Sequence, residues 1–216
     1  MVILSRGDLC FQCWKLIDLS NNDIMSQTGL IYGHGVMGWE NRLLFTDLET
    51  ERLLLKNISL EDREFILSQF SNDTINRYLY DAEPMTRLDD AAELIQFYMQ
   101  PEPRLQHRWI IVSKSGKEKM GTCGFHCWNQ KERSVEVGYD LCEAFWGKGY
   151  MTEAMKEIIS FARNRMCVRE IRACIYVDNS RSITLAERLG FMFTGTCHQA
   201  FRDNDYLHNN YSLLLD

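Results

Sequence analysis

Hydrophobic and polar residues alternate most regularly over residues 134–141. The odd-numbered positions are apolar: Val135, Val137, Tyr139 and Leu141. The positions between them are polar or lack a side chain: Glu136, Gly138 and Asp140. A period of two predicts a β-strand, because successive side chains point to opposite faces of a sheet. The segment is therefore an expected strand that carries a carboxylate, Glu136, near its middle.

A second pattern has the period of a helix. Apolar residues recur at spacings of three and four over residues 152–166, which predicts an amphipathic helix. Weaker patterns predict helices that begin at Ser59, near Leu88 and at Ser180. Ser59 is a good helix cap, and Glu61 and Asp62 behind it suit the positive end of a helix dipole.

The remaining periodic segments predict strands. They lie at residues 51–56, 108–113, 120–128 and 171–177, and at about 192–199 and 206–215. Gly121 and Gly124 interrupt one of them, which indicates a β-bulge. The predicted order is strand, two helices, three strands, helix, strand, helix and two strands. This order predicts an α/β (α+β) fold with a central mixed sheet flanked by helices.

Residues 1–45 show neither period and contain four closely spaced glycines, Gly29, Gly33, Gly35 and Gly38. We expect an N-terminal extension that is poorly ordered or loosely docked. Residues 46–216 then form the folded domain.

Composition narrows the class of protein. The chain has 216 residues, of which 45% are hydrophobic and 25% charged, as in an ordinary globular domain. Its net charge of −6 and the lack of a Lys/Arg block argue against a nucleic-acid partner. No apolar run is long enough for a membrane helix and no secretory signal pattern opens the chain, so we expect a cytoplasmic protein without a membrane partner.

The eight cysteines mostly stand alone in apolar runs, so free thiols are expected. Cys10 and Cys13 have the spacing of a metal-binding or redox pair. No second cysteine or histidine pair completes a zinc site, so no metal is expected.

Candidate chemistry begins at the turn before the clearest helix. Gly147 and Gly149, one residue apart, allow a tight turn in which backbone N–H groups converge and join those of the helix start. Such a corner favours a diphosphate. The alternative is a plain glycine turn between strand and helix. The spacing fits neither the dinucleotide-binding fingerprint nor the Walker loop.

Four ordered motifs resemble one family. Residues 136–141 (Glu-Val-Gly-Tyr-Asp-Leu), 145–154 (Phe-Trp-Gly-Lys-Gly-Tyr-Met-Thr-Glu-Ala), 179–182 (Asn-Ser-Arg-Ser) and 187–191 (Glu-Arg-Leu-Gly-Phe) are similar to those of the GNAT superfamily of acetyl-CoA-dependent N-acetyltransferases. Together with residues 50–55 (Thr-Glu-Arg-Leu-Leu-Leu), they resemble more narrowly its RimJ/RimL-like branch. The resemblance covers residues 46–216.

The resemblance implies a cosubstrate, acetyl-CoA, and the residues that would bind it. The turn would hold the diphosphate, the splayed end of the Glu136 strand would pair with the pantetheine arm, and an Asn would contact that arm. Trp146 is common in this branch, whereas Met151 is larger than the family's usual residue and would narrow the phosphate corner. For Asn179 a helix N-cap is an equal alternative. The implied coenzyme-binding residues are Val137, Tyr139, Leu141, Trp146, Gly147, Lys148, Gly149, Tyr150, Met151, Thr152 and Asn179.

The reaction needs a base, because an amine must lose a proton before it attacks the thioester. Glu136 is the candidate base, with an exposed or salt-bridged strand glutamate as the alternative. The family's usual acid, a Tyr seven residues after the Asn, is replaced by Ala186. Ser182 is the candidate substitute, and an ordinary first-turn helix serine is its alternative. Tyr211 and His198 are further candidates for the acid, although their positions match no motif of the family.

The expected function is transfer of an acetyl group from acetyl-CoA to a primary amine by direct attack. The resemblance favours a protein N-terminus as acceptor, with a small-molecule amine next. The helices near residues 60–100 and the loop at residues 202–205 are expected to recognise it. The alternative is a catalytically inactive coenzyme-binding or protein-interaction module on the same fold. A monomer or homodimer is expected.

Overall fold

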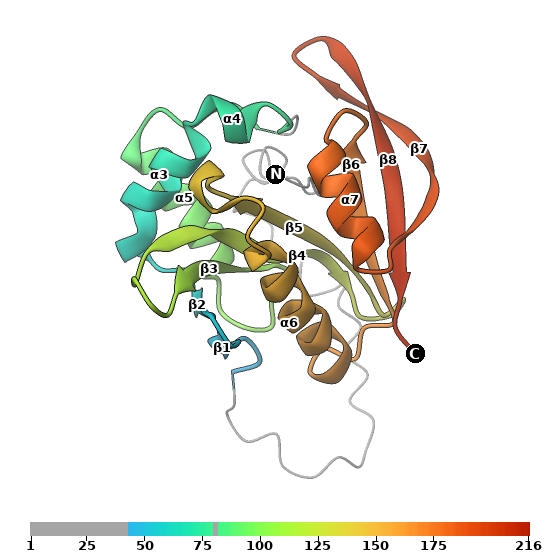
Figure 1. The fold of residues 1–216 in the computed structure, drawn as a ribbon, viewed down its shortest axis with the longest axis horizontal. Coiled ribbons are helices and arrows are strands. Elements are labelled where there is room, and N and C mark those ends of the chain that lie inside the picture. Colours follow the sequence, from blue (N-terminus) through green and yellow to red (C-terminus); the bar gives the residue numbers. More distant parts are fainter. Residues whose placement is uncertain (1–42, 80–81) are drawn as a thin grey trace, which may run out of the picture.

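The computed structural model describes residues 43–79 and 82–216. Figure 1 shows the elements in chain order. They are β1 (Leu48–Glu49), β2 (Leu53–Asn57), η1 (Leu60–Asp62), α3 (Arg63–Phe70), α4 (Asp73–Asn76), α5 (Leu88–Tyr98), β3 (His107–Ser113), β4 (Lys119–Asn129), β5 (Ser134–Leu141), η2 (Glu143–Phe145), α6 (Tyr150–Asn164), β6 (Glu170–Tyr176), α7 (Ser180–Arg188), β7 (Met192–Phe201) and β8 (Asn204–Leu214). The predicted order of elements is confirmed. η1 is the first turn of the helix predicted from Ser59. The additions β1, α4 and η2 are too short to leave a periodic pattern.

The strands form one sheet in the order β1-β2-β3-β4-β5-β6-β8-β7. Among the strands that the structure describes, only β5 and β6 are parallel, and every other neighbouring pair is antiparallel. The parallel pairing is short, because it runs from Ser134 opposite Glu170 to Glu136 opposite Arg172. β5 continues to Leu141. Within the described ranges, the second half of its edge toward β6 therefore has no strand partner.

Helices cover both faces of the sheet, so the expected mixed α/β architecture is confirmed. On one face α6 packs Met155, Ile158 and Phe161 against the strands in the larger hydrophobic core. On the other, α3 and α5 pack against Ile110 of β3 in a second core. In Figure 1 the helices α3, α4 and α5 gather together, apart from α6 and α7.

The main helix lies two residues earlier than the predicted span of 152–166. Gly149 has a left-handed backbone with φ of 78° and caps the helix, so α6 begins at Tyr150. Its last residue is Asn164, and Cys167, with φ of 55°, turns the chain away soon after. Positive φ values break the helix geometry at both ends.

The bulge predicted in β4 is confirmed at one of its two glycines. The register of β3 against β4 shifts between Ile111 and Val112, opposite Gly121. At Gly124 the register is regular, and this glycine has a different role. A Cβ atom on Gly124 would lie 2.1 Å from the carbonyl oxygen of His107. The close approach of two backbones therefore requires this glycine.

The predicted extension, residues 1–45, lies almost wholly outside the described residues, as do Cys10 and Cys13. Phe45 is described and is 2% exposed. Its ring stacks on His107 at a centroid distance of 4.3 Å and on Phe161 at 5.9 Å. Among the described helices, none has the length and apolar character needed to cross a membrane.

Candidate active site

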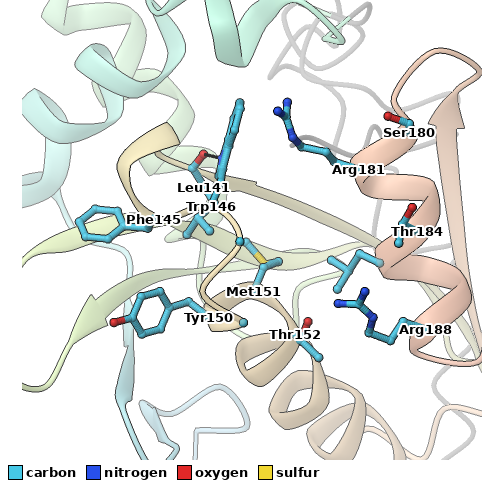
Figure 2. A pocket seen from close by; sticks show the side chains of 13 residues that line it. Leu141, Phe145, Trp146, Tyr150, Met151, Thr152, Ser180, Arg181, Thr184 and Arg188 are labelled. Atoms are coloured by element: carbon cyan, nitrogen blue, oxygen red, sulfur yellow. Dashed lines mark hydrogen bonds between the residues drawn. The ribbon is translucent and has the colours of Figure 1, made fainter.

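A cavity of about 310 Å³ lies between the η2–α6 connection and α7 (Figure 2). One wall comes from the end of β5, the glycine turn and the first turn of α6, and the other from α7. The lining residues are Leu141, Phe145, Trp146, Gly147, Gly149, Tyr150, Met151, Thr152, Ser180, Arg181, Thr184, Leu185 and Arg188. Two of them are arginines and none is a carboxylate, so the described lining is positively charged.

The glycine turn has the geometry that its sequence predicts. Gly147 and Gly149 have φ values of 73° and 78°, which other residues adopt only with strain. No atom lies within 4 Å of the position that a Cβ would occupy on Gly147. The start of α6 adds first-turn N–H groups that have no partner inside the helix, together with the positive end of its dipole. This corner of the cavity can therefore bind an anion.

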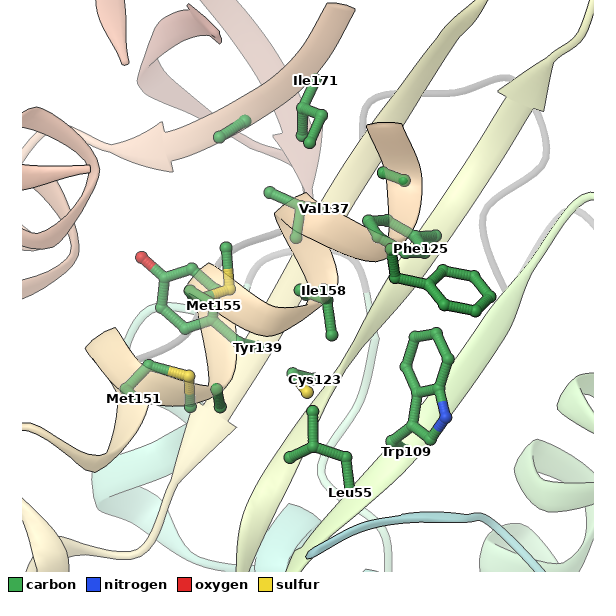
Figure 3. Packing of buried hydrophobic residues seen from close by; sticks show 14 of the residues in the cluster. Leu55, Trp109, Cys123, Phe125, Val137, Tyr139, Met151, Met155, Ile158 and Ile171 are labelled. Carbon is green, nitrogen blue, oxygen red and sulfur yellow. The ribbon is translucent and has the colours of Figure 1, made fainter. Parts of the chain in front are cut away.

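Met151 lies on the floor of this cavity rather than across its mouth. Its side chain is 3% exposed and belongs to the larger core with Met155. Figure 3 shows both methionines on α6. Most of Met151 is thus packed into the core, away from the turn.

Val137, Tyr139 and Leu141 belong to the core between the sheet and α6, and all three are at most 2% exposed. Figure 3 shows Val137 and Tyr139 in this core. The Tyr139 hydroxyl donates to the carbonyl oxygen of Ser182 at 3.5 Å, and burial raises the pKa of Tyr139. Because their side chains are buried, these residues can bind a ligand only through backbone groups on the edge of β5, past the point where its pairing with β6 ends.

Asn179 and Ser182 lie at the start of α7 and both are buried. The Asn179 side chain accepts a hydrogen bond from the Ser182 backbone N–H at 3.3 Å, so Asn179 is the N-cap of α7. The capping alternative is present in the structure, and the coenzyme contact of Asn179 stays a prediction. The same holds for the acid role of Ser182, whose residue is 0% exposed.

Glu136 is half-buried where β5 and β6 stop pairing. It lies opposite His126 of β4 and, in the parallel register, opposite Arg172 of β6. The pKa of Arg172 is raised first by a hydrogen bond to Glu170 and to a smaller degree by the charge of Glu136. Glu136 therefore lies where the two strands separate, and both its role as a base and the salt-bridged alternative stay predictions.

The structure adds a buried polar cluster that the sequence did not reveal. Arg108 donates to Thr122 at 2.7 Å and to Asp140 at 3.2 Å, and Gln69 donates to Asp140 at 2.7 Å. Burial raises the pKa of Asp140, against the opposing effects of Arg108, Thr122 and Gln69. An alternating strand does not show which of its polar side chains is covered, and here α3 covers Asp140.

His126 extends this cluster toward Glu136. Arg108 can only donate, so the His126 Nε2 atom, 3.2 Å away, accepts, and the Nδ1 atom carries the proton toward the Tyr98 hydroxyl at 3.2 Å. Burial, and then Arg108, lower the pKa of His126 to about 3. A Cβ on Gly138 would lie 2.8 Å from the Nε2 atom. Gly138 therefore makes room for this neutral ring beside the separating strands.

The cavity brings together seven of the predicted coenzyme-binding residues: Leu141, Trp146, Gly147, Gly149, Tyr150, Met151 and Thr152. Lys148 turns back, and its Nζ atom donates to the carbonyl oxygen of Ala144 at 2.9 Å. Tyr211 and His198, the reserve acids, lie on β8 and β7 and are not in the lining.

The α7 wall was missed. The lining residues at positions 181, 184, 185 and 188 are three or four residues apart. This spacing indicates one face of a helix, so the sequence contained a signal for this wall.

Comparisons with known proteins agree with this geometry. The acetyltransferase (GNAT) domain model matches residues 52–192. The uncharacterized N-acetyltransferase YoaA of Bacillus subtilis (strain 168) is 34% identical over 174 residues, which are 79% of this chain and 98% of that protein.

Two solved structures share the fold. One is a spermidine N-acetyltransferase from Vibrio cholerae in complex with CoA and spermine (TM-score 0.68, 20% identity, 76% of this chain and 96% of that chain). The other is RimL, a ribosomal L7/L12 alpha-N-protein acetyltransferase, in complex with coenzyme A (TM-score 0.71, 18% identity, 77% and 96%). These structures show that the fold is shared, and the narrower resemblance to the RimJ/RimL-like branch stays a prediction. Because the family model spans well over half of the sequence, this chain belongs to the GNAT acetyltransferases.

Proposed function

We propose that the protein transfers the acetyl group of acetyl-CoA to a primary amine. The observation that carries the proposal is the cavity between the glycine turn and α7. It joins a left-handed glycine turn, a helix N-terminus and two arginines with no carboxylate in its lining. That combination suits the polyanionic end of coenzyme A. Both solved relatives were crystallised with CoA, which supports the same ligand here.

In the proposed complex the backbone N–H groups of residues 147–152 bind the coenzyme diphosphate. The pantetheine arm then runs along the edge of β5 beyond Glu136, where the pairing with β6 has ended. Its amides would supply the hydrogen bonds that a neighbouring strand supplies elsewhere in the sheet. This path brings the thioester close to Glu136.

The proposed chemistry is a direct acyl transfer without a metal or a covalent enzyme intermediate. The amine nitrogen attacks the thioester carbon, the C–S bond breaks, and the sulfur leaves as a thiolate. Glu136 takes the proton of the amine, directly or through water, and a strand N–H near Val137 or Gly138 polarises the thioester oxygen. Ser182 is the proposed proton donor to the thiolate.

The proposed acceptor is a protein N-terminus, with a polyamine as the second candidate. RimL is an alpha-N-protein acetyltransferase, and the Vibrio cholerae enzyme acts on spermidine. Both substrates present a primary amine. Glu83 forms an ion pair with Arg202 in the turn between β7 and β8, and both residues belong to the segments that we propose to recognise the acceptor.

Calorimetry with CoA and a thiol-release assay against N-terminal peptides, polyamines and amino acids test the proposal. We expect CoA binding and turnover with at least one amine. Glu136→Gln should lower kcat by about 100-fold or more at neutral pH. Glu118→Gln, an exposed change in the β3–β4 turn, is the control and should retain wild-type turnover.

Two results would contradict the proposal. Binding of CoA without thiol release for every amine would favour the inactive module, whose supporting observation is the buried Ala186 in place of an acid. Unchanged activity of Glu136→Gln across the pH range would remove Glu136 from the mechanism.

A further inference from the structure

Trp146 and Arg181 contact each other from opposite walls of the cavity. The guanidinium carbon of Arg181 lies 4.3 Å from the centre of the Trp146 ring. Figure 2 shows Arg181 reaching from α7 toward the indole of Trp146, which is the first residue of the η2–α6 connection. The pair therefore joins the two walls of the cavity.

The indole is itself held in place. Its Nε1 atom donates to the carbonyl oxygen of Leu141 at 2.7 Å, which ties the ring to the last residue of β5. Arg181, by contrast, is exposed, and within the described ranges it forms no ion pair. An exposed cation on α7 thus rests on an aromatic ring that a hydrogen bond holds in place.

Stacking leaves the donors of the guanidinium available. A stacked arginine uses the face of its planar group, whereas its five N–H donors point outward in that plane. The contact with Trp146 therefore reduces the freedom of Arg181 without occupying a hydrogen-bond donor. Loss of freedom before binding favours affinity, because less entropy is lost when the ligand arrives.

The surroundings of Arg181 select for an anion. The described lining contains a second arginine, Arg188, and the hydroxyls of Ser180 and Thr184 from the same helix, but no carboxylate. The whole chain has 30 acidic and 24 basic residues. A lining with two arginines and no carboxylate therefore differs in charge from the chain as a whole. A guanidinium fork matches the geometry of phosphate oxygens.

We propose that Trp146 holds Arg181 as a phosphate-binding residue for the nucleotide end of the coenzyme, on the wall opposite the glycine turn. The inference rests on the proposed function, because it names a contact of the same coenzyme. Coenzyme A offers two phosphate groups with this chemistry, the diphosphate and the 3′-phosphate. Arg181 acts on binding and not on the reacting atoms.

The test measures Kd by calorimetry for CoA and for dephospho-CoA, which lacks the 3′-phosphate. We expect Arg181→Gln to raise the Kd for CoA about 10- to 100-fold, the effect of one charge-assisted hydrogen bond. An equal rise for dephospho-CoA assigns the contact to the diphosphate, and a rise for CoA alone assigns it to the 3′-phosphate. Arg181→Lys, which keeps the charge but loses the planar fork, should lie between the two.

The role of Trp146 is tested in the same assay. Trp146→Leu should weaken CoA binding, Trp146→Phe should retain most of it, and Arg181→Gln should add little in the Trp146→Leu background. Circular dichroism and thermal melting establish that each variant is folded. The control is Arg163→Gln, an equal charge change at an exposed α6 position outside the cavity, for which the wild-type Kd is expected.

The outcomes separate this inference from the proposed function. Absence of CoA binding in the wild-type protein would contradict the proposed function itself. Wild-type binding that Arg181→Gln leaves unchanged for both ligands would overturn only the role of Arg181. Full additivity of the Trp146→Leu and Arg181→Gln effects would show that the two residues act separately and would overturn the role of Trp146.

Discussion

The two sides of β5 are both covered, yet they are stabilised in different ways. On the α6 side, Val137, Tyr139 and Leu141 are buried among other apolar side chains. On the α3 side, Asp140 is equally buried but is surrounded by hydrogen-bond donors. The apolar side gains free energy from the area removed from water, whereas the polar side is stable only while every charged group keeps its partner.

This difference predicts unequal tolerance to substitution along one strand. An apolar residue in a packed core loses stability in proportion to the volume removed. A buried charge that loses its partner is left in a medium of low polarity, which costs more than the lost contact. Single changes on the polar side should therefore be the more damaging.

Asp140→Asn should have the largest effect, because it leaves the Arg108 guanidinium buried without its carboxylate. We expect a loss of about 3–5 kcal/mol in the free energy of unfolding, measured by urea denaturation. The double variant Arg108→Met/Asp140→Asn removes both charges and should recover part of that loss.

The matched control is Glu83→Gln, which removes an exposed ion pair with Arg202 and should leave the urea midpoint close to that of the wild type. A similar loss in the control and in Asp140→Asn would mean that the buried pair has no special role.

His126 gives the polar side a pH dependence. Its pKa is lowered from 6.5 to about 3 by burial and by Arg108, so below pH 6.5 the unfolded chain binds a proton that the folded chain does not. Acidification should therefore lower the free energy of unfolding by up to about 1.4 kcal/mol per pH unit between these values, with no contribution above them. His126→Asn should show a shallower slope than the wild type by up to this amount.

Gln130→Asn, an exposed change just after β4 that neither adds nor removes a titratable side chain, serves as the control and should keep the wild-type slope. His107, whose pKa is lowered to about 2 mainly by burial, contributes equally to all three proteins. Identical slopes for His126→Asn and the wild type would exclude His126 as the source.

Tyr139→Phe should have the smallest effect, because the apolar side loses only one long hydrogen bond to Ser182 and keeps its packing. The expected change is about 1 kcal/mol or less by urea denaturation. Tyr139→Ala, which also removes the ring, should cost several times more. A larger loss for Tyr139→Phe than for Asp140→Asn would reverse the comparison.

The sequence predicted the elements of this fold better than the contacts between them. The alternation along β5 and the helical period of α6 can each be read from consecutive residues. Both elements form at or within two residues of the predicted positions. α6 begins earlier than predicted because the backbone of Gly149 is left-handed. A glycine in the sequence permits this conformation but does not require it. The burial of Asp140 depends on Gln69, 71 positions away, so no local pattern could reveal it.

In the site, too, features contained in consecutive residues were predicted and those that depend on distant contacts were not. The glycine turn was predicted because its chemistry is contained in consecutive residues. Arg181 and Arg188 were missed, although they share a face of α7, because the position of that face opposite the turn results from tertiary packing. Glu136 lies where the strands separate, and its function as a base awaits the test above.

The burial of Phe45 affects how the role of the N-terminal segment can be studied. The backbone N–H groups of Leu44 and Phe45 donate to the Glu102 carboxylate at 2.6 and 3.0 Å, which anchors the ring between His107 and Phe161. A shortened chain that starts at Thr46 would lose this anchor and leave a hole the size of an aromatic ring. Deletion experiments should therefore cut ahead of Leu43, so that any defect reports on the removed segment and not on a missing piece of the core.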